Sequence, residues 1–194
     1  MADSYENTTF VKINGLSRAK SFLKFFGIDI VHFKKRIEDH GLRLRLLEMR
    51  DLSFLRAHYR PEHIPGIHVW EPGQFSSLFS LWKWLKASFH VFYLVEIKNV
   101  LRDPIIGFVA LYHLEIGRRL YIAVMLFNPE DRRRGYGRHA LTMLFNFLKE
   151  SGVVKEVCAE VFKSNVASLR LLQTLGFEVL EDQGGQLLLF KTIG

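Results

Sequence analysis

The sequence predicts a single mixed α/β domain, and three observations carry that prediction. The chain has 194 residues, about the length of one ordinary domain. Apolar residues make up 48% of it and charged residues 24%, which is close to the average for globular proteins. From residue 42 onward, short β-like runs occur between segments with helical periodicity, and this mixture is typical of strands and helices packed in layers.

Residues 1–41 are expected to form a helical extension that precedes a domain spanning residues 42–194. An apolar stripe predicts a first helix over Leu16–Gly27, and a capping aspartate predicts a second over Asp29–His40. Phenylalanines alternate there with lysines and arginines, so two roles stay open. The favoured role is packing on the domain or on a second subunit, which leaves a homodimer open. The less favoured role is contact with an anionic membrane surface.

The first half of the domain is predicted to begin with a strand and a helix. Proline residues then interrupt the chain before an aromatic-rich helix, and three β-branched and aromatic runs follow. In order, the predicted elements are a strand at Leu42–Leu47, helices at Met49–Tyr59 and Gln74–Ala87, and strands at Phe89–Ile97, Ile105–Tyr112 and Leu120–Phe127.

The second half contains the strongest helical signal, because the apolar residues of His139–Lys149 recur at spacings of three and four. A strand is predicted at Val153–Val161. A second helix is expected to begin at Ser164 or Asn165 and to end at a glycine. Two short strands around a Gly-Gly pair, Phe177–Leu180 and Gln186–Phe190, are typical of a hairpin.

Charge and cysteine content limit the range of possible partners and sites. The formal net charge of +7 favours anionic partners. A lone cysteine, Cys158, excludes an intramolecular disulfide and a cysteine-based zinc site, and we expect no metal. The longest apolar run, Leu120–Phe127, is far below the ~20 residues of a membrane span. The N-terminus lacks a signal peptide's features, so we expect a cytoplasmic protein.

The most informative segment is R-R-R-G-Y-G-R, Arg132–Arg138, between a predicted strand and a predicted helix. Gly135 and Gly137 let the backbone approach a ligand closely, and the helix N-terminus offers unpaired N–H groups. This arrangement suits a pyrophosphate. A P-loop is excluded because no Lys-Ser or Lys-Thr pair follows the second glycine. A dinucleotide fingerprint, an arginine-rich nucleic-acid patch and a simple basic turn are disfavoured alternatives.

A second segment, Ala159–Phe177, has a strand that passes through Asn165 into a helix ending in Gly-Phe. Together the two segments resemble the GNAT superfamily of acyl-CoA-dependent N-acetyltransferases. Its pyrophosphate motif (Q/R)-x-x-G-x-(G/A) is similar to Arg132–Gly137. The form N-x-x-S-x-R-x-L-x-x-L-G-F is most similar to the ribosomal-protein N-terminal acetyltransferase branch.

The resemblance implies a mixed, largely antiparallel sheet that is flanked by helices. Its two central strands, Leu120–Phe127 and Val153–Val161, would splay apart around the pantetheine arm of acetyl-CoA. The backbone of residues 125–127 would bind that arm, the amides of residues 133–138 would bind the pyrophosphate, and Asn165 would contact the arm. The implied cofactor-binding residues are Met125, Leu126, Phe127, Arg132, Arg133, Arg134, Gly135, Tyr136, Gly137, Arg138 and Asn165.

Acetyl transfer to an amine requires a base, because an ammonium is not a nucleophile. The resemblance places Glu160 in that role, and Glu96, His113 and Glu115 are weaker candidates. A backbone N–H near Leu126–Phe127 would stabilise the oxyanion. Many family members have a proton-donating tyrosine where this chain has Leu172, whose spacing predicts a core position. Ser168, Tyr121 or water could replace that donor.

These observations predict an acetyl-CoA-dependent N-acetyltransferase that acts on a protein N-terminus or a small-molecule amine. The alternative is a non-catalytic acyl-CoA-binding or scaffold module, associated with a membrane through its N-terminal helices. Nucleic acid is not an expected partner.

Overall fold

The computed structural model describes residues 8–10, 32–59, 74–98 and 104–193. Strands and helices alternate as the sequence predicts. The strands are β1 (Thr8–Phe10), β2 (His32–Lys34), β3 (Arg36–Asp39), β4 (Leu42–Leu46), β5 (Val91–Ile97), β6 (Ile105–Glu115), β7 (Arg119–Leu126), β8 (Glu156–Phe162), β9 (Glu178–Asp182) and β10 (Gln186–Thr192). The α-helices are α2 (Leu52–His58), α3 (Leu78–Ser88), α4 (Tyr136–Ser151) and α5 (Val166–Thr174), and the 3-10 turns are η1 (Met49–Asp51) and η3 (Pro129–Asp131).

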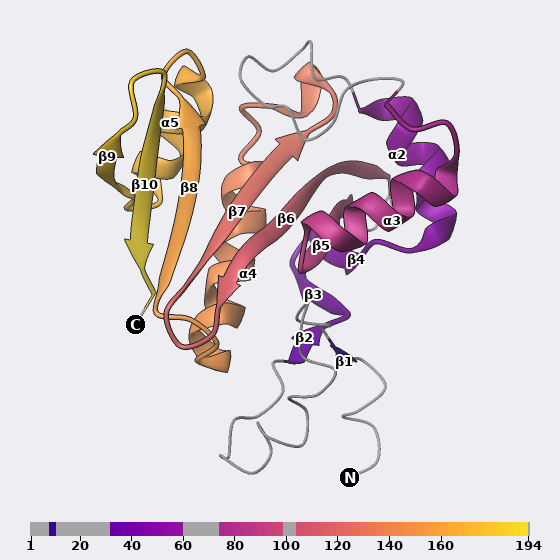
Figure 1. Ribbon diagram of the computed structural model, residues 1–194, viewed down its shortest axis with the longest axis horizontal. Coiled ribbons are helices and arrows are strands. Elements are labelled where there is room, and N and C mark those ends of the chain that lie inside the picture. Colours follow the sequence, from indigo (N-terminus) through magenta and orange to yellow (C-terminus); the bar gives the residue numbers. More distant parts are fainter. Residues whose placement is uncertain (1–7, 11–31, 60–73, 99–103, 194) are drawn as a thin grey trace, which may run out of the picture.

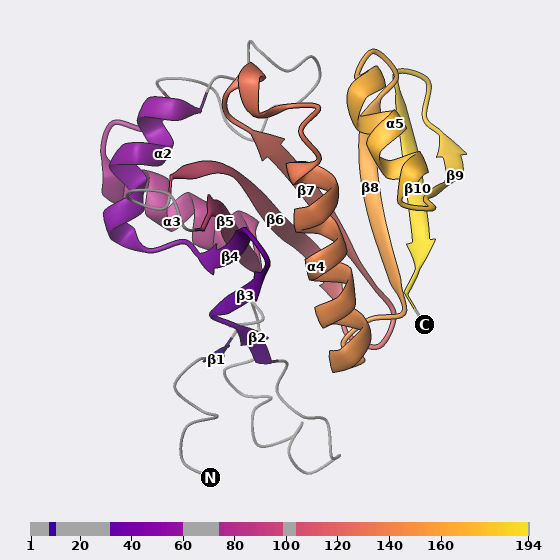
Figure 2. The same ribbon diagram turned by 180° about the vertical axis from the view of Figure 1, so that it is seen from behind.

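Eight of these strands form one sheet in the order β3-β4-β5-β6-β7-β8-β10-β9, which confirms the mixed, largely antiparallel sheet. All neighbouring pairs are antiparallel except β7 and β8, which run parallel. Helices α2 and α3 cover one face of the sheet, and α4 and α5 lie on the other (Figures 1 and 2). The result is a three-layer arrangement with one apolar core on each side of the sheet.

The central strands β7 and β8 separate as the resemblance implies. Their pairing covers three positions and ends at the pair Tyr121↔Cys158. Beyond that pair β7 continues beside β6, while β8 continues beside β10 (Figure 1). The facing edges of β7 and β8 therefore keep backbone groups that are not used in a ladder between them.

Helix ends follow local chemistry. Helix α3 begins later than predicted because Ser77 caps it, and its hydroxyl accepts a hydrogen bond from the N–H of Ser80 at 3.1 Å. Helix α4 is longer than its apolar stripe at both ends. It begins after Gly135 and ends at Gly152, and both glycines are left-handed. Among the described residues, no helix is long and apolar enough to cross a membrane.

The helix predicted over Asp29–His40 is wrong where the structure describes it. His32–Lys34 and Arg36–Asp39 are strands, and β3 pairs with β4 around a turn at Gly41. The prediction rested on Asp29 as a cap and on Gly41 as a helix end, and neither signal distinguishes a helix from extended chain that turns at a glycine. Gly41 has φ +84° and lies at the turn between β3 and β4. The helix predicted over Leu16–Gly27 lies outside the described residues, and the division at residue 41 remains a prediction.

Candidate functional site

The N-terminus of α4 presents unpaired backbone donors. Gly135, the N-cap, has φ +85°, a left-handed conformation that favours glycine. The first helical hydrogen bond of α4 runs from the N–H of His139 to the carbonyl of Gly135 at 2.9 Å. The N–H groups of Tyr136, Gly137 and Arg138 precede that bond and therefore have no intrahelical partner. Together with the helix dipole, they make this end of α4 suitable for an anion.

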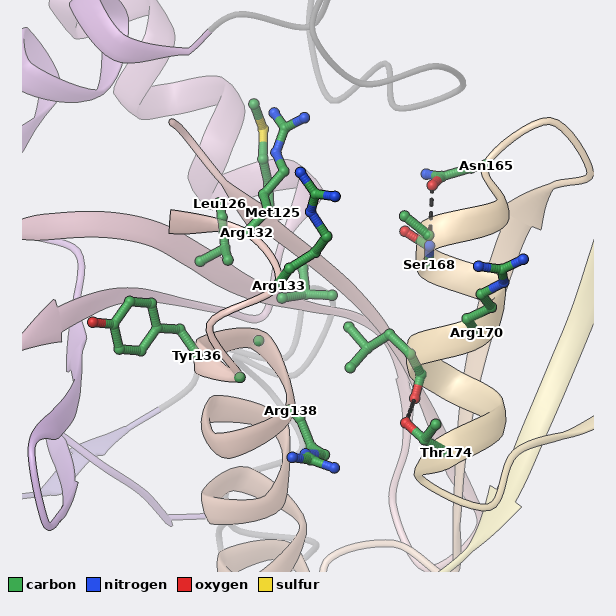
Figure 3. Close-up of a pocket in the computed structure, with 15 residues that line it drawn as sticks. Met125, Leu126, Arg132, Arg133, Tyr136, Arg138, Asn165, Ser168, Arg170 and Thr174 are labelled. Carbon is green, nitrogen blue, oxygen red and sulfur yellow. Dashed lines mark hydrogen bonds between the residues drawn. The ribbon is translucent and has the colours of Figure 1, made fainter. Parts of the chain in front are cut away.

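A cavity of about 520 Å³ opens beside this helix end, between β7 and α5 (Figure 3). Its described lining includes four arginines, Arg132, Arg133, Arg138 and Arg170, and no carboxylate. Burial lowers the pKa of Arg132 below its usual value, which shows that its charge sits partly away from water. A cavity with this charge selects a ligand carrying several negative charges.

The opposite wall comes from α5. The Asn165 side-chain oxygen caps this helix by accepting a hydrogen bond from the N–H of Ser168 at 3.1 Å (Figure 3). Within the described residues the Asn165 amide nitrogen makes no hydrogen bond, so it remains able to donate to a ligand. Gly137 faces this wall closely, because a Cβ atom placed on it would lie 3.4 Å from Leu171. A larger side chain at Gly137 would enter the cavity.

The edge of β7 supplies backbone groups to the same cavity. The N–H of Phe127 donates to the carbonyl of Ile106 at 2.9 Å, so this residue is bonded to β6. Backbone groups alternate in an antiparallel ladder, which directs those of Leu126 and Val124 away from β6, toward the gap. The expectation that Phe127 offers its N–H to a ligand or an oxyanion is therefore corrected, and Leu126 is the residue that retains this ability.

Most of the residues predicted to bind a cofactor line the cavity. Those that do are Met125, Leu126, Arg132, Arg133, Gly135, Tyr136, Gly137, Arg138 and Asn165. Phe127 and Arg134 do not. The Phe127 ring is buried among aromatic side chains on the other face of the sheet. The Arg134 guanidinium lies over the ring of Tyr136, 5.9 Å from its centroid.

Sequence reasoning did not assign the rest of the lining to the cofactor site, although it named Ser168 as a possible proton donor and included Arg170 in the motif. The unassigned residues are Val124, Ala167, Ser168, Arg170, Leu171 and Thr174. Five of these lie on α5, where spacings of three and four put them on a common face. The prediction concentrated on the cap of this helix, and helical periodicity after Asn165 was the signal that could have identified the rest.

Glu160 lies on the other side of the sheet from α4. Its neighbours Ala159 and Val161 are buried in the core that α4 covers, so alternation along β8 directs Glu160 to the opposite face. The side chain is exposed, and it does not line the cavity. Burial raises the pKa values of Tyr112 and Tyr121, and the Glu160 carboxylate adds to both shifts, with a smaller effect than Cys158 in the case of Tyr121.

Three other positions that were weighed for acid and base roles are engaged elsewhere, namely Leu172, Glu96 and Glu115. Leu172 is 3% exposed and lies in the core, as its spacing predicts. Glu96 is buried in an ion network, where it accepts hydrogen bonds from Arg45 at 2.9 Å and Arg43 at 3.2 Å. Glu115 pairs with Arg118 at 2.7 Å.

Comparison with known proteins gives a family and a fold. The model of the acetyltransferase (GNAT) family matches residues 52–177. No curated protein matches the chain in sequence.

Three solved structures illustrate the shared fold. A domain from Methanocaldococcus jannaschii DSM 2661 is 20% identical, with a TM-score of 0.66 over 79% of this chain and 99% of that one. Spermidine N-acetyltransferase from Vibrio cholerae, in complex with CoA and spermine, is 19% identical, with a TM-score of 0.64 over 79% and 96%. Ribosomal-protein-S5-alanine acetyltransferase from Vibrio fischeri is 19% identical, with a TM-score of 0.60 over 81% and 96%.

Proposed function

Because the chain belongs to the acetyltransferase (GNAT) family, we propose that it is an acetyl-CoA-dependent N-acetyltransferase that passes the acetyl group directly to a primary amine. The observation that carries this proposal is the arginine-lined cavity at the N-terminus of α4, which reaches the free edge of β7. A single cavity thus combines a site for phosphates with backbone groups that can bind amides.

The donor would be held from both ends of the cavity. The N–H groups of residues 136–138 and the surrounding arginines would bind the pyrophosphate. Val124 would offer its N–H and carbonyl groups, and Leu126 its carbonyl, to the two amides of the pantetheine arm, as a neighbouring strand would. The amide nitrogen of Asn165 would donate to the same arm from α5.

The acceptor would be deprotonated on the face of the sheet opposite α4, where Glu160 lies. An alkyl ammonium has a pKa of about 10, so a base must take its proton before nitrogen attacks the thioester carbon. Glu160 would accept that proton directly or through water, and the N–H of Leu126 would donate to the oxyanion. As the C–N bond forms and the C–S bond breaks, sulfur leaves as a thiolate whose pKa is about 8.5. Such a leaving group needs little help from an acid.

The buried Leu172 favours one alternative, a module that binds acyl-CoA without catalysis, because no side chain at that position can donate a proton. The acceptor class is also part of the proposal. The N-x-x-S-x-R pattern around Asn165 supports a protein N-terminus, as in the ribosomal-protein branch that it resembles, and a small-molecule amine is the other choice.

The test is the release of CoA thiol from acetyl-CoA in the presence of an alanine-starting peptide, 2-phenylethylamine or spermidine. We expect release with at least one acceptor, and a kcat lowered about 100-fold or more by Glu160→Gln. Glu178→Gln, which changes an exposed carboxylate on the edge strand β9, is the matched control and should retain full activity. Binding of acetyl-CoA without thiol release on all three acceptors would favour the non-catalytic module.

A further inference from the structure

A cluster of three rings lies on the face of the sheet opposite α4. Tyr112 and Tyr121 are directly opposite each other on β6 and β7, with ring centroids 5.6 Å apart. The centroid of the His113 ring lies 5.2 Å from that of Tyr112 and 5.6 Å from that of Tyr121. The register of β6 shifts at this point, and His113 has φ +46°, which is uncommon for a residue other than glycine. The backbone thus accepts an unfavourable conformation where these rings meet.

This ring cluster lies where β7 and β8 part. Tyr121 forms the last pair between the two strands, with Cys158. Glu160 follows two residues later on β8 and faces the same side as Cys158. The carboxylate influences both tyrosine hydroxyls electrostatically. Tyr112, Tyr121 and Glu160 therefore lie on the same face of three adjacent strands, near the closed end of the gap.

The sheet surface next to the tyrosines is made of small side chains. Ala110 and Ala123 are directly opposite each other and lie on the same face as Tyr112 and Tyr121. Along the same strands, the next residues on this face are Phe108 and Met125. Ala110, Phe108 and Met125 are buried in the core that α2 and α3 cover, whereas Tyr112 and Tyr121 are partly exposed.

On this face, some charged groups and hydroxyls have a partner among the described residues and others do not. Glu115 pairs with Arg118 and Arg119, and Glu156 is next to Arg119 in the β7–β8 register. In the described part of the chain Glu160 has no ion pair, and the hydroxyls of Tyr112 and Tyr121 make no hydrogen bond. Burial raises the pKa values of both tyrosines, and Glu160 adds to this shift, although at Tyr121 Cys158 contributes more and Arg119 opposes it. Both hydroxyls therefore remain protonated at neutral pH.

We propose that Tyr112, Tyr121 and Glu160 form the acceptor subsite of this chain, and that it binds one primary ammonium group rather than a polycation. An ammonium has three N–H donors, and one carboxylate and two phenol oxygens supply three acceptors. The proposal rests on the proposed function, because it places the acceptor at the thioester end of the donor.

The charges around the subsite explain why it would bind an acceptor with a single ammonium group. Glu160 is the carboxylate without a paired cation among the described residues of this cluster, and Arg119 lies close by on the same face. A second ammonium on the acceptor would meet Arg119 rather than another free carboxylate. The subsite therefore selects a monoamine or a peptide N-terminus over a polyamine.

The experiment is calorimetric titration of 2-phenylethylamine, and separately of spermidine, into the complex of the protein with CoA. CoA has no acetyl group, so no reaction occurs and binding alone is measured. The variants are Tyr112→Phe, Tyr121→Phe and Glu160→Gln, and Glu178→Gln is the control. We expect Glu160→Gln to raise the Kd for 2-phenylethylamine at least about tenfold and each tyrosine variant severalfold, because a charged pair contributes more than a neutral hydrogen bond.

Four outcomes are informative. Unchanged affinity in all three variants, or no binding of 2-phenylethylamine to a complex that does form with CoA, overturns the subsite while the donor site stands. Spermidine binding at least about tenfold tighter, a difference of ~1.4 kcal/mol, overturns the single-ammonium claim. Failure of CoA itself to bind the wild-type protein overturns the proposed function and, with it, this inference. Retained CoA affinity in each variant shows that the loss of amine binding is not a loss of folding.

Discussion

The guanidinium of Arg45 holds the carboxylate of Asp51 through two hydrogen bonds, Nη1–Oδ2 at 2.8 Å and Nη2–Oδ1 at 3.1 Å. Arg45 lies on β4, and Asp51 ends the 3-10 turn that leads into α2. The Arg45 Nε also donates to Glu96 on β5 at 2.9 Å. All three side chains are largely buried, so this network fixes the start of α2 against the sheet.

Replacing Asp51 should destabilise the protein, because it leaves a buried guanidinium with less compensation. We expect Asp51→Asn to lower the free energy of unfolding at neutral pH by about 3 kcal/mol, as measured by urea denaturation. Arg56→Gln, a change at an exposed residue of α2, should leave that free energy within about 0.5 kcal/mol of the wild-type value.

The effect of Asp51 should depend on pH. Burial alone would raise the pKa of Asp51, but the bonds from Arg45 and from the N–H of Glu48 outweigh it and lower the pKa below its usual value. A lowered folded-state pKa stabilises the protein above about pH 4 and loses that contribution as the pH falls further. The gap between wild type and Asp51→Asn should therefore shrink below about pH 4; a gap of constant size would contradict this account.

Gly107 on β6 is predicted to be essential for the shape of the donor cavity. A Cβ atom there would collide with the backbone carbonyl of Met125 on β7, and a backbone group cannot rotate away. We expect Gly107→Ala to displace β7, to cost about 1–3 kcal/mol of stability and to weaken CoA binding. Gly185→Ala has open space around it and should show neither effect in melting and titration experiments.

Arg170 on α5 should contribute to donor affinity through charge. It lines the cavity across from Arg138, and its side chain is exposed. We expect Arg170→Gln to weaken CoA binding about tenfold at low salt, or ~1.4 kcal/mol, and by less at high salt because exposed charges are screened. Arg56→Gln again provides a charge-matched control. Equal losses at both salt concentrations would rule out an electrostatic origin.

Leu172 should matter for stability and not for the chemical step. Its side chain is buried in the core under α4 and α5, so Leu172→Ala should cost about 2–5 kcal/mol. Measured well below the melting temperature, kcat should stay at the wild-type value. Leu180→Ala, at an exposed position of β9, should change neither quantity. A large fall in kcat for Leu172→Ala alone would show that this position acts in the reaction.

The sequence predicted helices most reliably where the apolar residues follow a helical repeat and a capping residue marks an end. The apolar stripe of α4 and its glycine C-cap, and the asparagine cap of α5, identified both helices of the candidate site. The stretch from His32 to Asp39 was misassigned because a glycine can end a helix or form the turn between two strands. Only the pairing of β3 with β4 decides between them, and that pairing depends on the turn at Gly41.

Strand register explains what the sequence could not show about the site. Whether the N–H of Phe127 or of Leu126 is free depends on which residue of β6 lies opposite. Likewise, Tyr112, Tyr121 and Glu160 are separated by many residues, and only the pairing of three strands brings them together. The α5 wall was missed for a similar reason, since the packing of that helix against Gly137 decides which of its faces lines the cavity.

The most direct test of the central claim, that the cavity beside α4 binds acetyl-CoA, is thermal unfolding of the wild-type protein and of Gly137→Asp with and without acetyl-CoA. Gly137→Ala is the control, since a Cβ atom fits there. An aspartate in the first turn is favourable for the helix dipole, so Gly137→Asp should stay folded while its carboxylate repels the phosphates. The account predicts stabilisation of the wild-type protein and Gly137→Ala by about 2.7 kcal/mol at a hundredfold excess over Kd, and none for Gly137→Asp. An unchanged melting temperature of the wild-type protein with acetyl-CoA, or an equal rise in Gly137→Asp, would contradict it.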